Sequence, residues 1–180
     1  WWPLVEKKEV EAIIVTASGC GVTVKEYGHL LRYDSVYAGK AATISTLAKD
    51  ISEILHAELG NLQHLFSQKH TALKTKLSFH SPCTLQHGMQ IRGVVEEILQ
   101  AAGFELSYVA NAHLCCGSAG TYSILQPELS QQLLKNKLAA LESSNPDHIA
   151  TANIGCLMHL KSGAALPVKH WIELLDERLS

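Results

Sequence analysis

Four of the five cysteines in this 180-residue chain fall into one spaced pattern. Cys83 is followed after 31 residues by the run Cys115-Cys116-Gly117, and Cys156 comes 38 residues after that run. Thiolates are soft ligands, so thiols drawn from three distant segments predict a fold organised around iron or zinc. An odd number of cysteines without a secretory signal argues against a disulfide framework and favours a reducing cytoplasm.

Short β-rich runs alternate with longer runs of helical periodicity. The predicted strands are residues 12–16, 76–80, 105–109, 148–152 and 167–169. The predicted helices are residues 39–59, 91–102, 125–141 and 171–179. Alternating helices and mostly apolar strands predict an α/β fold in which a parallel sheet is covered on both faces.

Two short segments recur along the chain. Residues 14–20 resemble residues 149–156, because each continues an apolar strand through Thr-Ala to Gly-Cys at the start of a helix. Residues 49–55 likewise resemble residues 169–175. The recurrence predicts two related lobes, the first of them incomplete at its N-terminus. The expected division is residues 1–60 for the remnant of the first repeat, 61–75 for a connection and 76–180 for the second repeat.

Each cysteine group of the pattern lies just beyond the carboxyl end of a predicted strand, where open parallel sheets place their ligands. We therefore expect one metal site. The candidate ligands are Cys83, Cys115, Cys116, Cys156 and His159, with Cys20 and His80 as further candidates. His159 is included because Cys156-x-x-His159 spacing places two ligands on one face of a helical turn.

The spacing leaves several kinds of site open. His80-x-x-Cys83 together with Cys156-x-x-His159 matches a Cys₂His₂ zinc site, but zinc takes four ligands and would leave Cys115-Cys116 unused. A Cys-Cys pair with two further thiolates favours an iron–sulfur cluster. Any single thiol, Cys20 above all, is also a plausible core residue.

Composition excludes two functional classes. The net charge is −2 at pH 7 and the pI is near 6.6, so the chain has no electrostatic footprint for nucleic acid. Its apolar stretches are far shorter than the roughly 20 residues of a membrane-spanning helix. We therefore expect no transmembrane segment.

The cysteine segments resemble the cysteine-rich CCG domain of the heterodisulfide reductase type. Within that group, residues 80–87 (HSPCTLQH), 114–121 (LCCGSAGT) and 151–156 (TANIGC) are similar to the bacterial glycolate oxidase iron–sulfur subunits, and residues 16–27 to the end of their first CCG motif. The resemblance implies two tandem CCG repeats. Cys20 then belongs to the first, and Ala17 stands where a partner cysteine would be.

By resemblance, Cys83, Cys115, Cys116 and Cys156 bind the [4Fe–4S] cluster of the second repeat. His159 occupies the position of the motif's last cysteine, which leaves open a complete cluster, a zinc ion or an empty site. Cys20 cannot complete the first site with the residues of this chain.

The resemblance also implies a function: electron transfer within a glycolate dehydrogenase complex that oxidises glycolate to glyoxylate. FAD would lie in a partner subunit, and the electrons would pass toward a quinone-type acceptor. The complex would be cytoplasmic, peripheral at the inner face of the cell membrane, and this chain would not be active alone. The alternatives are a zinc-stabilised structural or assembly module and a thiol-redox enzyme that uses Cys115-Cys116 as a switchable disulfide.

Overall fold

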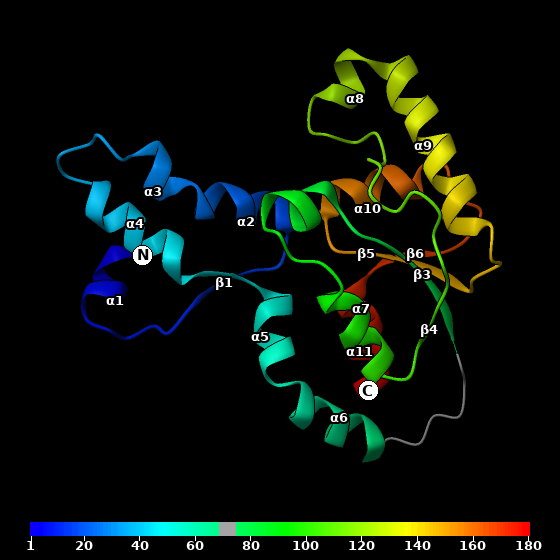
Figure 1. The fold of residues 1–180 in the computed structure, drawn as a ribbon, viewed down its shortest axis with the longest axis horizontal. Helices are drawn as coiled ribbons and strands as arrows, with labels where there is room; N and C mark the ends of the chain where they lie inside the picture. The colour runs from blue at the N-terminus through cyan, green and yellow to red at the C-terminus, as the bar shows by residue number, and fades with distance from the viewer. Residues whose placement is uncertain (69–74) are drawn as a thin grey trace.

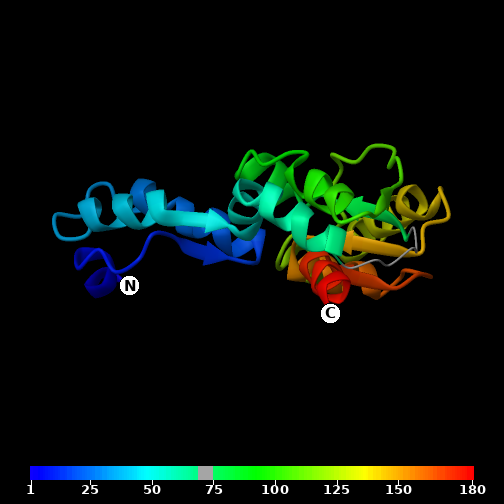
Figure 2. The ribbon, with the colours of Figure 1, turned by 90° about the horizontal axis from the view of Figure 1, so that it is seen from below.

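A computed structural model describes residues 1–68 and 75–180, and these form two α/β units placed end to end (Figures 1 and 2). The first unit contains a two-stranded parallel sheet, β1-β2, and the second a four-stranded parallel sheet in the order β4-β3-β5-β6. The N-terminus lies in the first unit and the C-terminus in the second (Figure 1). The predicted α/β fold with parallel sheets is therefore confirmed.

Helices and strands alternate along the chain. The first part contains α1 (Trp2–Glu6), β1 (Ile13–Val15), α2 (Ser18–Lys25), α3 (Tyr27–Leu30), α4 (Ala38–Leu47), β2 (Ala48–Asp50), α5 (Ile51–Ala57) and α6 (Leu59–Gln68). The second contains β3 (Lys76–His80), the π-helical turn η1 (Thr84–Gly88), α7 (Val94–Ala101), β4 (Glu105–Leu106), α8 (Tyr122–Leu125), α9 (Pro127–Glu142), β5 (His148–Thr151), α10 (Ile154–Lys161), β6 (Val168–His170) and α11 (Trp171–Leu179). Among the described residues, no helix is both long and apolar enough to cross a membrane.

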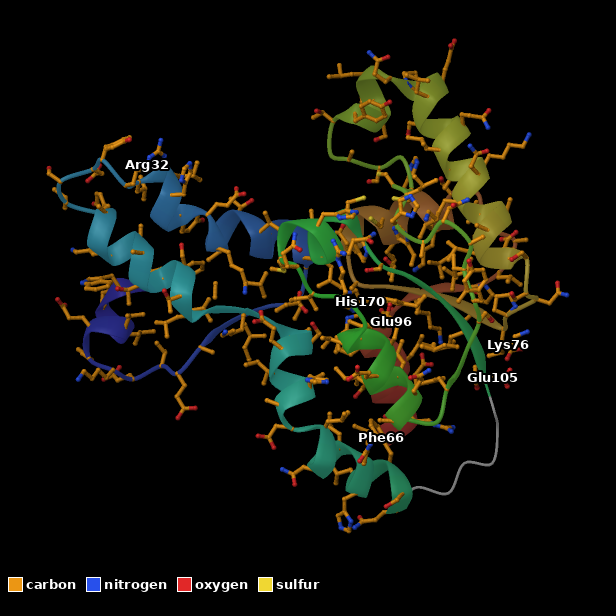
Figure 3. All side chains as sticks on the ribbon, in the orientation of Figure 1. Arg32, Phe66, Lys76, Glu96, Glu105 and His170 are labelled. Atoms are coloured by element: carbon orange, nitrogen blue, oxygen red, sulfur yellow. The ribbon has the colours of Figure 1, made fainter. Side chains whose placement is uncertain are left out.

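The four-stranded sheet is covered on both faces. Because side chains alternate along a strand, Leu77 and Phe79 of β3 face one layer and Ser78 and His80 face the other. The first layer is a core formed with α7, α11 and Phe66 of α6 (Figure 3). The second layer is a smaller core formed mainly with α9 and α10. Buried polar groups lie on this second side of β3, toward the cysteine loops.

The first unit has a much smaller core of its own. The buried apolar side chains of this core are Val24, Ile44 and Ala48, against which Ile13 and Tyr27 pack. The helices that follow belong to the larger core, since Ile51 and Leu55 of α5 and Leu59 and Leu62 of α6 pack against it.

The prediction of one continuous helix over residues 39–59 is wrong. The chain leaves α4 at Ala48, runs as β2 in register with β1, and enters α5 at Ile51. Asp50 causes the restart: its carboxylate accepts a hydrogen bond from the Ser52 N–H at 2.9 Å, while Glu53 accepts one from the Asp50 N–H at 2.9 Å. This reciprocal capping box starts a new helix at a point where periodicity alone shows no break.

Smaller differences concern element ends. The predicted helix over residues 91–102 starts at Val94, because Gly93 takes a left-handed conformation with φ 77°. The first part of the predicted connection over residues 61–75 is the end of α6, and residues 69–74 lie outside the described residues. The division into residues 1–60, 61–75 and 76–180 stays a prediction.

Candidate metal centre

Three loops at the carboxyl edge of the second sheet carry the cysteines. Cys83 precedes η1 after β3, Cys115 and Cys116 lie in the loop between β4 and α8, and Cys156 stands in the first turn of α10. The strands β3, β4 and β5 are parallel, so these loops leave the sheet at the same edge. The structure thus brings together residues separated by up to 73 positions.

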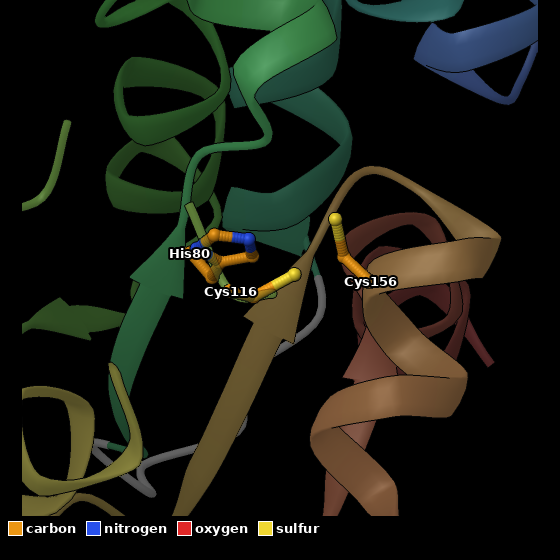
Figure 4. Close-up of side chains that lie close together, drawn as sticks. All are labelled: His80, Cys116 and Cys156. Atoms are coloured by element: carbon orange, nitrogen blue, oxygen red, sulfur yellow. The ribbon is translucent and has the colours of Figure 1, made fainter. Parts of the chain in front are cut away.

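The tightest group within this site is His80, Cys116 and Cys156. Their potential ligand atoms all lie within 4.8 Å of one another, and Figure 4 shows the three side chains directed toward a common point. His80 and Cys116 are each 1% exposed. Neither ring nitrogen of His80 has a hydrogen-bond partner among the described residues. A buried imidazole without partners is costly, so its position fits a metal ligand.

The remaining thiols extend this group. Hydrogen bonding from Cys116 and then from Cys83 lowers the pKa of Cys115 to about 2. Hydrogen bonding from Cys116, aided by the neighbouring His80 imidazole, lowers the pKa of Cys156 to about 5. The pKa values of Cys83 and Cys116, which donate in these contacts, are raised. The four thiols therefore influence one another, and the ionised form is favoured at Cys115 and Cys156.

The main chain at Gly117 contacts both a cysteine sulfur and helix α9. The Gly117 N–H donates to Cys115 Sγ over 3.3 Å, as amides do toward ligating sulfur. Gly117 has φ +96°, and a Cβ built there would collide with the Ser130 carbonyl and lie 3.2 Å from His159 Nε2. Only glycine fits this position without moving α9 or α10.

His159, one of the predicted ligands, contacts α9, and its role as a ligand stays a prediction. Its Nε2 lies 3.3 Å from Ser130 Oγ, and that hydroxyl donates to the Gly117 carbonyl over 2.9 Å. The imidazole thus supports the back of the Cys-Cys loop, outside the group formed by His80, Cys116 and Cys156. The structure brings the four cysteines and His80 together, and it places His159 one layer behind them.

Cys20 of the first unit faces the same site. A cavity of about 470 Å³ is lined by Cys20, Cys83, Cys115, Cys156, by the loop 118–120 and by residues 153–155 at the start of α10. Cys20 itself is exposed. The wall is held by Ser18, whose hydroxyl lies 2.7 Å from Thr84 Oγ1 and accepts from the Asn153 amide at 3.3 Å. Helix α2 therefore closes one side of the cysteine site.

Sequence reasoning missed Lys137, a buried lysine on α9. Its ammonium donates to the carbonyls of Asn111 at 3.1 Å and Ala112 at 3.2 Å, in the loop that leads to Cys115. Burial lowers the pKa of Lys137, while the four thiols oppose this lowering. A signal was available, because residue 137 follows Leu134 by three positions and precedes Leu141 by four, on the buried face of α9.

The donor set suits a soft metal centre. Four thiols and one unpartnered imidazole gather at one edge of the sheet, with a glycine at the closest backbone approach. Thiolates with imidazole are ligands of both iron–sulfur clusters and zinc. The residues present therefore fit either group.

Comparison with known proteins agrees with this donor set. Residues 77–161 match the cysteine-rich CCG domain family. The chain is 49% identical over 179 residues to the glycolate oxidase iron–sulfur subunit of Escherichia coli K12, covering 99% of this chain and 42% of that protein. It is 35% identical over 161 residues to a probable glycolate oxidase iron–sulfur subunit of Bacillus subtilis, covering 88% and 35% respectively.

A more distant relative is lactate utilization protein A of Bacillus velezensis, 26% identical over 180 residues that cover 95% of this chain and 72% of that protein. The chain spans less than half the length of the two glycolate oxidase relatives. The chain is thus a homologue of the glycolate oxidase iron–sulfur subunits and contains a CCG cysteine-rich domain.

Proposed function

We propose that this chain is part of an iron–sulfur electron-transfer subunit in a glycolate dehydrogenase complex. The observation that carries the proposal is the gathering of four thiols near the unpartnered imidazole of His80: Cys116 and Cys156 form a compact group with it, and Cys83, Cys115 and Cys156 line one cavity. The identity of 49% to a glycolate oxidase iron–sulfur subunit supports the same interpretation.

In this proposal Cys83, Cys115, Cys116 and Cys156 hold a [4Fe–4S] cluster. Of the two candidate histidines, the geometry favours His80 as an additional ligand, since its ring nitrogens lie among the thiols while His159 contacts Ser130. Cys20 lies across the cavity and contributes to the wall of the site. The cluster would supply reversible one-electron transfer, which none of the side chains provides alone.

The proposed partners follow from the same resemblance. FAD in a partner subunit would accept the two electrons and two protons released when glycolate is oxidised to glyoxylate, and the cluster would supply one-electron transfer toward a quinone-type acceptor. The residues of this chain would bind the cluster and orient its sulfur ligands. The complex is proposed to be cytoplasmic and peripheral at the inner face of the cell membrane.

The proposal keeps the division of the chain made from the sequence. Residues 76–180 form the second CCG repeat, residues 61–75 the connection and residues 1–60 the remnant of the first. In support, α2 of the first part contributes Ser18 and Cys20 to the site of the second.

A zinc-stabilised assembly module is the second candidate function. It is favoured by one observation, the compact group of His80, Cys116 and Cys156. With one further thiolate these residues would provide the four ligands of a tetrahedral zinc site. Metal and acid-labile sulfide analysis of anaerobically purified protein separates the candidates. Iron with sulfide supports the proposal, zinc alone supports the module, and titratable thiols without metal support a thiol-redox enzyme built on Cys115-Cys116.

The two histidines give a sharper test of the ligand set. We expect His80→Ala to lower iron and sulfide content or change the paramagnetic resonance spectrum of the reduced protein, because it removes a group among the thiols. The matched variant His159→Ala should keep the spectrum, since it removes only a support of the Gly117 loop. The reverse pattern would restore His159 as the ligand.

A further inference from the structure

Lys137 is a buried cation outside the proposed ligand set. Only 3% of its surface is exposed, and no carboxylate of the described residues forms an ion pair with it. Burying an ammonium without a counter-charge is strongly unfavourable, and its two carbonyl partners provide only dipoles. An anionic group is therefore needed nearby.

The anionic group that this position faces is the thiol set. Lys137 and Cys115 line one cavity of about 240 Å³, together with Leu114, Leu133 and Asn136. Cys115 also lines the neighbouring cavity together with Cys83 and Cys156, so Lys137 lies beside the thiol set. An ammonium has three N–H donors, and two of them are used by the Asn111 and Ala112 carbonyls.

Helix α9 holds the loop of Cys115 and Cys116 at both ends. Lys137 fixes the carbonyls before Cys115, and Ser130 fixes the carbonyl of Gly117 after Cys116. The two contacts differ in kind, because Ser130 brings a neutral hydroxyl and Lys137 a positive charge. A helix that served only to hold the loop would not need a buried charge at one of its two contacts.

We propose that Lys137 is the counter-ion of the metal–thiolate centre: a positioning residue that holds the Cys115 loop and raises the reduction potential of the centre. This inference rests on the proposed iron–sulfur function. Reduction adds one electron, and therefore one negative charge, to the cluster. A cation in a low-dielectric site stabilises that reduced state more than the oxidised state.

The test is the midpoint potential of the anaerobically purified holoprotein, measured by redox titration with paramagnetic resonance. Lys137→Gln removes the charge and keeps an N–H donor, so the equilibrium constant for one-electron reduction should fall at least about tenfold, a shift of 59 mV toward lower potential. Lys137→Arg keeps the charge and should stay close to the unmodified protein. Lys135→Gln, an exposed position on the same helix, is the matched control and should cause no shift.

The outcomes are distinguishable. Loss of cluster in Lys137→Gln but not in Lys137→Arg also supports a charge requirement. An unchanged potential in Lys137→Gln with full iron and sulfide overturns the inference and leaves the proposed function standing. Equal loss of cluster in both Lys137 variants reduces the residue to a structural one and overturns the inference as well. Unmodified protein without iron and sulfide overturns both proposals.

Discussion

The β1–α2 turn and the β5–α10 turn have the same construction but different surroundings. Each strand leads through Thr-Ala into a helix that has its cysteine at the third position, Cys20 in α2 and Cys156 in α10. Each strand also pairs in parallel with a later strand, β2 or β6, that ends in a capping box. Yet Cys20 is exposed, whereas Cys156 lies with Cys116 and His80.

The neighbouring strand accounts for the difference. In the second sheet β5 has β3 on the side opposite β6, and β3 ends in His80 and leads to Cys83. In the first sheet, within the part of the chain that the structure describes, β1 pairs with β2 alone. A cysteine at a helix start thus becomes part of a ligand set only when a second strand edge supplies the others.

The residues before the two cysteines have also diverged. Asn153 caps α10 and accepts hydrogen bonds from the Gly155 and Cys156 amides, at 2.8 and 3.3 Å. Ser18, which follows Thr-Ala in the first turn, bonds instead to Thr84 and to Asn153 itself. The β5–α10 turn therefore orients its own cysteine, Cys156, whereas the β1–α2 turn binds residues of the Cys83 and Cys156 segments.

The largest expected effect comes from replacing Cys156 and Cys20 by serine in two separate variants. Cys156→Ser should reduce iron and sulfide content by about tenfold or more, because a hydroxyl is a harder and poorer ligand for iron than a thiolate. Cys20→Ser should keep the full content, since Cys20 faces the cavity from an exposed position. Iron and acid-labile sulfide per chain measure both.

If Cys20→Ser loses the cluster as Cys156→Ser does, both cysteines are ligands, and the proposed difference between the two turns is wrong. A change in spectrum at full iron content would instead show that Cys20 alters the environment of the centre without binding it.

The next effect concerns the first residues of α11 and α5. Trp171 is fully buried and Ile51 is half-buried against the same core. Trp171→Ala should lower the free energy of unfolding by about 3–5 kcal/mol, as expected for a large buried side chain. Ile51→Ala should lower it by about 1 kcal/mol, because less apolar area leaves water on folding. Urea unfolding under anaerobic reducing conditions measures the two, and equal losses would show that α5 is as firmly embedded as α11.

Much of the fold follows from the sequence because hydrophobic periodicity is local. The strand β3 and the helix α11 agree with their predicted ranges, and α9 starts at Pro127, two residues inside the predicted range 125–141. The strand β2 was missed because Ala48-Lys49-Asp50 has no β-rich composition, and only its pairing with β1 extends it. The resemblance of residues 49–55 to residues 169–175 could have indicated β2, because a strand was predicted over residues 167–169, at the start of the second of these segments.

The candidate site divides in the same way. The meeting of the cysteine segments could be predicted, because parallel strands bring their carboxyl ends to one edge. The positions of the two histidine rings could not, because the contact of His159 with Ser130 of α9 depends on tertiary packing, and the ligand set itself stays a prediction. Lys137 was missed because a single lysine on an amphipathic helix is usually solvated, and its burial depends on the loop above it.

The smallest effect separates the two capping boxes by their response to pH. The α5 box uses Asp50 and Glu53, and the α11 box uses His170 and Glu173. Burial lowers the pKa of His170 below its ordinary value of 6.5, so its folded form favours the neutral ring that accepts from the Ile172 N–H. The stability it contributes is present above pH 6.5 and is lost as the pH falls through the lower folded pKa.

The α5 box should survive that range. Burial opposes ionisation of Glu53, but the Asp50 N–H, Lys25 and Lys49 together lower its pKa below 4.5, so its contribution is lost only under more acidic conditions. Each cap is worth about 1 kcal/mol at pH 7.5. Urea unfolding should show that the cost of His170→Ala shrinks between pH 7.5 and 5.5, while the cost of Asp50→Ala stays constant. A constant cost for both variants would mean that folding does not lower the pKa of His170. The two capping boxes would then respond to pH in the same way.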